Sequence, residues 1–310
     1  MAKKRSKKAS VTAIAAVVLA VALWALEYFG DVDLGDLPVD EILGTSTSSR
    51  KKDSAENPGT EVHFVDVGQG DGALIISDGE AMVIDTGERD SEDVFLNYLK
   101  EQGIDKLKYL IITHPHTDHM GEAADIISEI ETEAIIMPKI TGDMVPTNST
   151  YKNFLKTVKS EGLKITASTD TTYTLGGAEV QLFTTKEEHS DLNNYSTLVK
   201  VVHGDNSFLF TGDCEEEEEK EMLEQGFDLS ATVLSAGHHG SSYSSTTAFL
   251  KEVNPQYAVV SYGVGNSYGH PHAAAVKRLK QQAENYYTTA DDGNIIFLSD
   301  GEGLTVETEK

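Results

Sequence analysis

The chain has 310 residues, of which 39% are apolar, and it contains a single cysteine, Cys214. This composition is typical of a globular protein and excludes a largely disordered chain, and one cysteine excludes an intramolecular disulfide. The formal net charge is −26, and the 20 basic and 51 acidic residues from residue 11 onward leave −31. Such an excess of negative charge opposes binding to nucleic acid unless a local feature offsets it.

Residues 1–29 have the pattern of a segment that enters a membrane. Five basic residues within the first eight precede 16 uncharged residues, VTAIAAVVLAVALWAL. An apolar helix of about 17–25 residues spans a bilayer and about 7–15 suit a cleaved signal peptide, so this length lies at the boundary. We expect an uncleaved anchor, because Trp24, Tyr28 and Phe29 resemble an interfacial belt. A cleaved signal peptide and a buried core helix are the alternatives. Either export interpretation places the remainder outside the cytoplasm, anchored on the outer face of the cytoplasmic membrane or secreted.

Residues 30–60 carry Gly, Ser, Thr, Pro and mixed charges without sustained periodicity, which predicts a flexible linker. From Glu61 onward, short apolar runs alternate with amphipathic segments, so we predict a folded domain over residues 61–310.

The domain begins with predicted strands over residues 61–77, 80–87, 107–113 and 132–138, and helices over 91–103, 119–130 and 149–162. Its second half is predicted to hold strands over 178–185, 196–204, 207–213, 231–237 and 257–263, with helices over 214–226, 245–253 and 273–284. A closing hairpin over 293–309 completes the pattern. Two sheets flanked by helices fit this order better than one open parallel sheet.

The segment THPHTDHMGE, residues 113–122, directly follows a predicted strand and holds His114, His116, Asp118 and His119. His114 and His116 can face one ion in an extended turn, while Asp118 and His119 point to a neighbouring position. Imidazole nitrogen and carboxylate oxygen suit Zn, Mn or Fe, and two close metals need such a divided set. A polar surface loop is the alternative, and it explains poorly why so many ligand types occur within six residues.

Two later groups of candidates also follow predicted strands. Asp213 ends the run SFLFTGD, where it can bridge two ions, cap the acidic helix that follows, or do both. GHHGS contains His238 and His239, and GNSYGHPH contains His270 and His272. Seven of the ten histidines therefore fall in three clusters, which indicates a metal centre.

Six motifs, in chain order, resemble those of the metallo-β-lactamase fold: HFVDVGQGDGALI, VIDTG, THPHTDHMG, NNYSTLVKVVHGDNSFLFTGD, GHHGS and GNSYGHPH. Within that fold they resemble the extracytoplasmic hydrolase domain of the ComEC family of DNA-uptake channel proteins. The resemblance covers about residues 61–310. It implies an α/β fold, the metallo-β-lactamase-like αββα four-layer sandwich, with a metal site at one edge between the sheets.

The resemblance also implies a role for each motif residue. His114 and His116 would bind one divalent ion, Asp118 and His119 would bind a second, and Asp213 would bridge them. The two ions are expected to be Zn or Mn.

The remaining roles come from the later motifs. His239 is the expected further ligand of the second ion and His238 would face the substrate, although GHHGS leaves open which of the two is the ligand. His270 would be an additional ligand or a proton donor, so Asp118, His238 and His270 are the expected catalytic residues. Four other motif positions would shape the loops under the site: Asp66, Gln69, Asp71 and Asp85.

The chain departs from the wider superfamily at one ligand position. Many members have a further histidine before the bridging aspartate, whereas this chain has Asn194, so the first ion would have fewer protein ligands. His203, the nearest upstream histidine, is interpreted as a turn residue before Gly204. The chain also lacks the many membrane spans of a ComEC channel, so transport itself is not implied.

These features predict an extracytoplasmic hydrolase that uses a metal-bound hydroxide, because bound metals lower the pKa of water from 15.7 to about 7. The expected activity is that of a phosphodiesterase or nuclease on DNA. A small cell-surface phosphodiester, such as a choline-phosphate ester, is the alternative that the net charge favours. The basic groupings of note are residues 50–52 and the helix segment with Lys277, Arg278 and Lys280. β-Lactam hydrolysis and a non-catalytic surface binding module are further alternatives.

Overall fold

The structure is a computed structural model that describes residues 59–89 and 93–310. The predicted anchor over residues 1–29, and all but the last two residues of the predicted linker over 30–60, lie outside the described residues and remain predictions. None of the helices in the described part of the chain has the length and apolar character that crossing a bilayer requires.

Two sheets form the centre of the domain. The first consists of β1 (Thr60–Phe64), β2 (Gly72–Ser77), β3 (Glu80–Thr86), β4 (Lys106–Ile111), β5 (Glu131–Met137), β6 (Ile165–Ala167), β14 (Ile295–Ser299) and β15 (Leu304–Thr308). Its spatial order is β15-β14-β1-β2-β3-β4-β5-β6. The second consists of β7 (Thr171–Leu175), β8 (Ala178–Phe183), β9 (Leu198–His203), β10 (Asn206–Phe210), β11 (Val233–Ser235), β12 (Tyr257–Val260) and β13 (Asn285–Thr288). Its order is β13-β12-β11-β10-β9-β8-β7.

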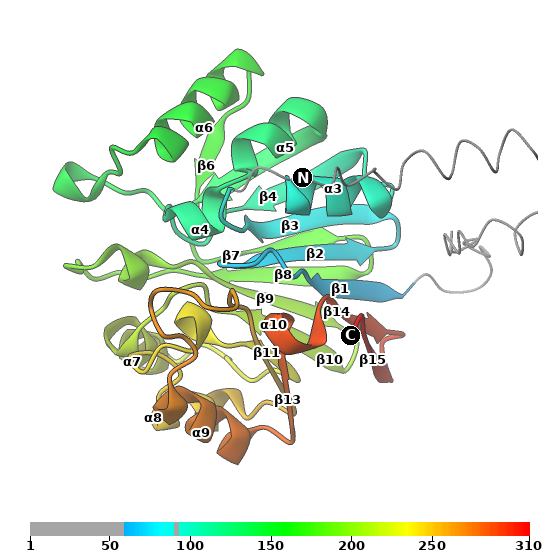
Figure 1. The fold of residues 1–310 in the computed structure, drawn as a ribbon, viewed down its shortest axis with the longest axis vertical. Helices are drawn as coiled ribbons and strands as arrows, with labels where there is room; N and C mark the ends of the chain where they lie inside the picture. The colour runs from blue at the N-terminus through cyan, green and yellow to red at the C-terminus, as the bar shows by residue number, and fades with distance from the viewer. Residues whose placement is uncertain (1–58, 90–92) are drawn as a thin grey trace, which may run out of the picture. The chain divides into compact units, whose positions relative to one another are not determined.

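Helices cover the outer face of each sheet, as Figure 1 shows. The first sheet is covered by α3 (Val94–Glu101), α4 (Thr117–Met120), α5 (Ala123–Glu129) and α6 (Ser149–Ser160). The second is covered by α7 (Glu216–Gln225), α8 (Thr247–Val253) and α9 (Ala273–Gln282), and the short α10 (Thr289–Asp292) follows β13. Within the described residues three 3₁₀ turns complete the fold: η2 (Gly142–Met144), η3 (Leu192–Tyr195) and η4 (Gly237–Gly240). The predicted αββα sandwich and the closing hairpin, β14 with β15, are confirmed.

Apolar side chains fill the space between the sheets and beneath the helices. Phe64 from the first sheet and Phe210 from the second stack with ring centroids 5.3 Å apart. Phe154 joins α6 to the outer face of the first sheet, and Met222 joins α7 to the outer face of the second. Full burial of such a side chain stabilises the fold by about 1.5–3 kcal/mol. Strands that are covered on both faces explain why segments such as LKYLIIT read as nearly continuous apolar runs.

The direction of the strands determines where the motif loops lie. β3, β4 and β5 are parallel to one another, and so are β10, β11, β12 and β13. Loops after the carboxyl ends of parallel strands meet at one edge of a sheet, where ligands bind in open α/β sheets. The histidine loop follows β4, Asp213 follows β10, η4 follows β11 and the GNSYGHPH loop follows β12.

Candidate metal centre

The loop after β4 is fixed by a buried carboxylate at the end of β3. Asp85 accepts hydrogen bonds from the backbone N–H of Thr113, at 2.8 Å, and from its hydroxyl, at 2.6 Å. The next residue, His114, is fully buried, and its Nε2 lies 3.0 Å from His116 Nδ1. The structure therefore brings His114 and His116 together, as expected for ligands of one ion.

Helix α4 presents the second pair of candidates. His116 precedes the helix in an extended conformation, so Asp118 lies in its first turn and His119 in its last. Asp85 Oδ2 lies 2.8 Å from Nδ1 of the fully buried His119. This contact holds the ring so that Nε2 faces the other candidates, the usual arrangement for a metal-binding histidine.

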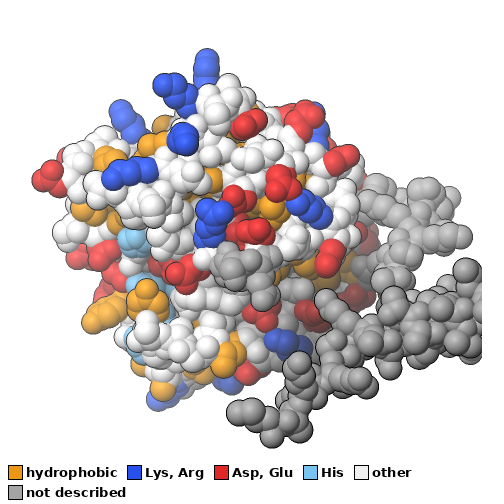
Figure 2. Space-filling view, turned by 45° about the horizontal axis from the view of Figure 1, so that its top comes forward, with side chains coloured by type: hydrophobic (Ala, Val, Ile, Leu, Met, Phe, Trp, Pro, Cys, Tyr) orange, Lys and Arg blue, Asp and Glu red, His pale blue; other side chains and the backbone are white. Residues whose placement is uncertain are grey.

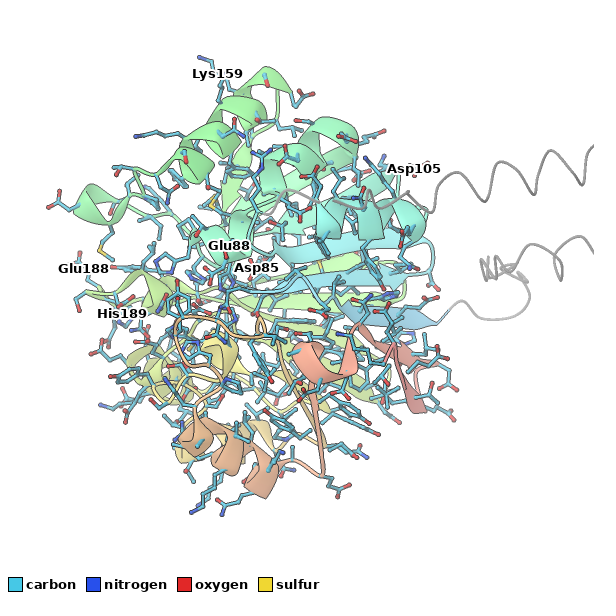
Figure 3. All side chains as sticks on the ribbon, in the orientation of Figure 1. Asp85, Glu88, Asp105, Lys159, Glu188 and His189 are labelled. Atoms are coloured by element: carbon cyan, nitrogen blue, oxygen red, sulfur yellow. The ribbon has the colours of Figure 1, made fainter. Side chains whose placement is uncertain are left out.

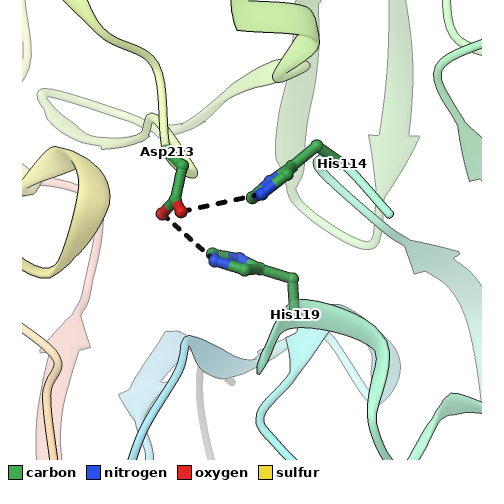
Figure 4. A group of neighbouring side chains, drawn as sticks. All are labelled: His114, His119 and Asp213. Carbon is green, nitrogen blue, oxygen red and sulfur yellow. Dashed lines mark ion pairs between the residues drawn. The ribbon is translucent and has the colours of Figure 1, made fainter. Parts of the chain in front are cut away.

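Asp213 lies between two groups of imidazole nitrogens. Its Oδ1 is 3.1 Å from His119 Nε2 and 3.5 Å from His239 Nε2. Its Oδ2 is 3.6 Å from His114 Nε2 and 3.7 Å from His238 Nε2. Figure 4 shows the carboxylate facing His114 and His119 with one oxygen toward each. A carboxylate placed in this way has the geometry that a bridge between two ions requires.

The two histidines of η4 both adopt positive φ, +52° in each case. This conformation is uncommon for residues other than glycine and accumulates at functional sites. His239 Nδ1 donates to the carbonyl of Ser261 at 3.0 Å, which leaves Nε2 free to act as a ligand and places it 3.3 Å from Asp118 Oδ2. His238 is partly exposed, and its Nδ1 lies 3.1 Å from Glu215 Oε1.

His270 stands beside this pair rather than inside the cluster. Its ring centroid is 5.2 Å from that of His238 and 6.2 Å from that of His239. Burial, together with the positive charge of His238 and His239, lowers the pKa of His270 to about 4. A neutral ring at pH 7 is suited to accept a proton or to act as a further ligand.

The cluster passes a test for metal binding that does not depend on any resemblance. Three buried atoms, His119 Nε2, His239 Nε2 and Asp213 Oδ1, make no well-aligned hydrogen bond with any described residue. Buried polar atoms without a partner are rare in proteins, and an ion is one of the accepted explanations. In each of three groups the ligand atoms lie within 4.8 Å of one another: His114 with His119 and Asp213, Asp118 with His119 and His239, and Asp71 with Asp85 and His119. The expected ligand His116 belongs to none of these groups. The donors are nitrogen and carboxylate oxygen, which suit Zn or Mn.

Electrostatics favour metal-binding protonation states at two candidate ligands, Asp213 and His114. Burial alone would raise the pKa of Asp213, but the positive charge of His119 and His239 outweighs it and holds that pKa well below the usual range. Burial lowers the pKa of His114 well below its ordinary value, and the charge of His119 lowers it further. Asp213 is therefore ionised and His114 neutral at pH 7, as ligands must be. At His119 and His239 burial is outweighed by the charge of Asp213, which raises the pKa well above the ordinary value, so a bound ion would have to displace a proton from each ring.

An open cavity of about 310 Å³ gives access to the cluster. Asp118, Asp213, His238, His239 and His270 line it together with residues that the motif analysis did not select. Among them are Asn148, at the start of α6, and Tyr268, in the loop after β12.

Three of the four expected supporting residues, Gln69, Asp71 and Asp85, line the cavity or contact the cluster, whereas Asp66 pairs with Lys310. Asp71 Oδ1 is 3.3 Å from His239 Nδ1, and Asp85 is described above. Gln69 Oε1 accepts a hydrogen bond from the backbone of Gly263 at 3.2 Å, which ties the first motif loop to the loop after β12. Asp66 accepts from the backbone of Gly68 within its own turn. Figure 3 labels Asp85 at the inner end of β3, close to this edge of the molecule.

Asn194 and its neighbour Asn193 have different surroundings. Asn194 Oδ1 accepts hydrogen bonds from the backbone N–H groups of Glu215 and Glu218, so this residue caps α7 and does not face the cluster. Asn193 lines the cavity, and its Nδ2 lies 3.5 Å from His238 Nδ1. The sequence contained both residues in NNYS, but adjacency alone could not tell which side chain faces the site.

The other sequence-selected residues have structural surroundings. His203 is the last residue of β9 and lies next to the turn at Gly204. Its Nδ1 is 2.9 Å from the Ser299 hydroxyl. His272 Nδ1 accepts from the backbone of Ser242 at 2.9 Å. Cys214 is buried at the start of the α7 segment.

Comparisons with known proteins agree with this geometry. The family model described as "Metallo-beta-lactamase superfamily" matches residues 65–264.

Three competence or recombination proteins are similar in sequence. "ComE operon protein 3" of Bacillus subtilis (strain 168) is 28% identical over 258 residues, 76% of this chain and 33% of that protein. "Recombination protein 2" of Haemophilus influenzae is 28% identical over 244 residues, 77% of this chain and 29% of that protein. "Competence protein ComA" of Neisseria gonorrhoeae is 27% identical over 235 residues, 75% of this chain and 31% of that protein. The chain thus spans about a third of the length of these relatives.

Solved structures share this fold at low sequence identity. The metallo-beta-lactamase fold protein YhfI from Bacillus subtilis matches with a TM-score of 0.52 and 15% identity, over 77% of this chain and 100% of that one. CmlA, a diiron beta-hydroxylase from Streptomyces venezuelae, matches with a TM-score of 0.50 and 15% identity, over 78% of this chain and 54% of that one. At this identity the likeness establishes the fold, and one fold can carry unrelated reactions.

Proposed function

The chain belongs to the metallo-beta-lactamase superfamily and is related to the ComEC competence proteins, and from this premise we propose that it is a metal-dependent phosphodiesterase that cleaves DNA. The observation that carries the proposal is the position of Asp213, with one oxygen toward His119 and His239 and the other toward His114 and His238. This divided set opens into the cavity of about 310 Å³.

The residues of the chain have distinct tasks in this proposal. Asp85 and the Ser261 carbonyl orient His119 and His239, so that both Nε2 atoms face Asp213. Asp118 and Asp213 hold negative charge beside them. Divalent ions bound here would supply a nucleophile at neutral pH and would stabilise the charge that develops on a phosphoryl group. His238 and His270 both line the cavity. His238, paired with Glu215, is placed to deliver a proton to the leaving oxygen, whereas the neutral His270 is placed to accept one.

The proposed test uses the purified chain with Mn or Zn, linear DNA and an Asp118→Ala variant. We expect metal-dependent degradation that chelator abolishes and that falls at least a hundredfold in the variant, because a lost ligand weakens the site. Glu88→Gln is the matched control, since Glu88 is an exposed carboxylate close to the site (Figure 3). Metal content measured by elemental analysis should fall in Asp118→Ala and stay unchanged in Glu88→Gln.

A small phosphodiester is the second candidate, and the formal charge of −26 favours it. Bis(p-nitrophenyl) phosphate separates the candidates when it is assayed beside DNA. Hydrolysis of the small ester without DNA degradation by a well-folded, metal-loaded protein would transfer the proposal to a small cell-surface ester. Failure of both reactions would favour a non-catalytic binding module.

We also propose that the domain is exported and anchored through residues 1–29. The proposal rests on five basic residues followed by 16 uncharged ones. Protease treatment of intact cells should degrade the domain, and a protected domain would contradict the proposal.

A further inference from the structure

Helix α6 carries a row of lysines that starts at the cavity. Asn148 lines the cavity and caps the helix, since its Oδ1 accepts from the backbone of Tyr151 at 2.9 Å. Lys152, Lys156 and Lys159 follow at intervals of four and three residues, which places them along the same face of the helix as Asn148. At a rise of about 1.5 Å per residue, the row extends roughly 16 Å from the cavity.

The three lysines, which we call the α6 lysine row, are exposed and make no ion pair or side-chain hydrogen bond within residues 59–89 and 93–310. Lys139 and Lys164 flank the row, so residues 139–164 hold five lysines and two acidic residues in a chain of net charge −26. Figure 2 shows Lys and Arg side chains gathered over the part of the molecule that α6 forms, with histidine visible below them on the same side. The sequence-based view that basic groupings occur at residues 50–52 and 277–280 is therefore incomplete.

The loop after β12 presents an aromatic ring on another side of the same cavity. Tyr268 lines the cavity and is 64% exposed. Its ring lies nearly parallel to that of His270, with centroids 5.7 Å apart and planes inclined by 22°. Asn266 holds the loop, because its Oδ1 accepts from the backbones of Tyr268 and His270 and its Nδ2 donates to the carbonyls of Gly263 and His270. The backbone that carries the exposed ring is thus fixed in position, which reduces the entropy that binding would cost.

Resting on the proposed nuclease function, we infer that the cavity takes a single-stranded nucleic acid whose phosphates lie along the α6 lysine row and whose base stacks on Tyr268. Proteins that bind single strands combine a basic track for the backbone with aromatic rings for the bases. A small ester in the cavity is too short to reach Lys159. A base inside a duplex is covered on both faces by its neighbours and offers no face to Tyr268.

Charge reversal of the α6 lysine row tests the first part of the inference, the contact between these lysines and the phosphates of the nucleic acid. Binding of a fluorescent 20-nucleotide single strand is measured in the full chain, with Asp118→Ala present in every protein so that nothing is cleaved. We expect Lys152→Glu/Lys156→Glu/Lys159→Glu to weaken binding at least tenfold at low salt. The slope of log affinity against log salt should fall by about 2, since each single-strand phosphate contact contributes about 0.7.

The matched control reverses three exposed lysines on α8 and α9, Lys251→Glu/Lys277→Glu/Lys280→Glu, which lie at the opposite end of the molecule from α6 in Figure 1. It changes the net charge equally and should weaken binding less than threefold. Equal losses in the two triple variants would overturn the inference. A loss of binding to phosphatidylserine vesicles, with strand binding retained, would overturn it in favour of a membrane surface.

Variants of Tyr268 test the second part of the inference, the stacking of a base on this ring. Tyr268→Ala should weaken single-strand binding about fivefold or more, whereas Tyr268→Phe should bind like the parent, because stacking needs the ring and not the hydroxyl. A strand of abasic sites should not distinguish the three proteins. Tighter binding of a duplex than of the single strand would contradict the inference.

Activity separates this inference from the function on which it rests. With Asp118 intact, the lysine-row variant should show at least a tenfold lower ratio of kcat/KM for the single strand to kcat/KM for bis(p-nitrophenyl) phosphate. An unchanged ratio in a protein that cleaves both substrates would overturn the inference and leave the nuclease proposal standing. Absence of hydrolysis with the binding results as expected would reject the nuclease proposal alone.

Discussion

Helices α6 and α7 both carry runs of like charge, but they use them in opposite ways. The lysines of α6 are exposed and unpaired within the described residues. In contrast, two of the five consecutive glutamates at 215–219, Glu218 and Glu219, are buried, and so is the nearby Glu221. Glu219 accepts from the backbones of Ser245 and Thr246 at the start of α8, and Glu221 accepts from the backbone of Lys186. Part of the negative charge of the α7 segment is thus committed to the interior.

This difference changes how the net charge should be interpreted. Burial raises the pKa of Glu218 well above its ordinary value and raises that of Glu219 to about 7. A formal count treats both as full surface charges, although neither contributes in that way at neutral pH. A chain of −26 can therefore present a basic surface beside its candidate site, because charge acts where it is exposed.

The largest expected effect concerns how α6 is attached. Phe154 is fully buried beneath the helix, and we expect Phe154→Ala to lower the free energy of unfolding by about 3–5 kcal/mol. Urea denaturation in chelator measures it. Leu155→Ala is the control, because Leu155 is 39% exposed and should cost much less. Equal losses would mean that α6 does not depend on Phe154 for its position.

The next largest effect should be a pH dependence of the free energy of unfolding, caused by Glu219 of α7. Because burial raises the pKa of Glu219 to about 7 from an unfolded value of 4.5, the folded state holds this proton more tightly. The resulting stability is fully present below pH 4.5 and is lost as pH rises toward and through about 7. Glu219→Gln stays neutral, so we expect it to gain up to about 3 kcal/mol relative to the parent between pH 4.5 and pH 8.

Unfolding of both proteins across this range measures that difference, and other titrating groups cancel in the comparison. Glu216→Gln changes an exposed glutamate of the same helix and should track the parent. Parallel curves for Glu219→Gln and the parent would contradict the assignment of a raised pKa to Glu219.

A smaller difference in the free energy of unfolding is expected between variants that lack the N-terminal caps of α7 and α6. Asn194 is buried and caps α7 through two backbone N–H groups, whereas Asn148 is exposed and caps α6 through one. We expect Asn194→Ala to cost about 2 kcal/mol and Asn148→Ala about 1 kcal/mol. Thermal unfolding of both variants checks the order, and the reverse order would show that burial does not strengthen the α7 cap.

The smallest effect should come from the lysine row. Lys156→Ala should change the free energy of unfolding by less than about 0.5 kcal/mol, because the side chain is exposed and makes no ion pair or side-chain hydrogen bond in the described part of the chain. Urea denaturation provides the measurement. A larger loss would indicate that the row stabilises the fold and would weaken its interpretation as a binding surface.

The sequence was informative where local pattern and strand direction agree. HPHTDH, Asp213 and GHHG each follow an apolar run, and parallel strands bring their carboxyl ends together, so the cluster could be predicted without coordinates. The lysine row has a readable spacing in STYKNFLKTVKS, but no local signal places the first residue of that helix at the cavity. Burial of Glu218 and Glu219 depends on what packs against α7, which spacing does not encode.

Asn193, Asn194 and Tyr268 show the same limit. The two asparagines are adjacent, yet one lines the cavity and the other caps a helix some twenty residues later in the chain. Tyr268 lies in a loop without periodicity, so only the tertiary position of Asn266 and His270 reveals that its ring is held at the cavity.

The division of the cluster between the two sheets has a consequence for biosynthesis. His114 and His119 follow β4 of the first sheet, whereas Asp213 and His239 follow β10 and β11 of the second. A nascent chain that has left the ribosome only as far as α6 holds one half of the cluster and none of the other. Tight metal uptake must therefore wait until residue 239 has emerged and the sheets have docked, so that bound metal reports a completed molecule.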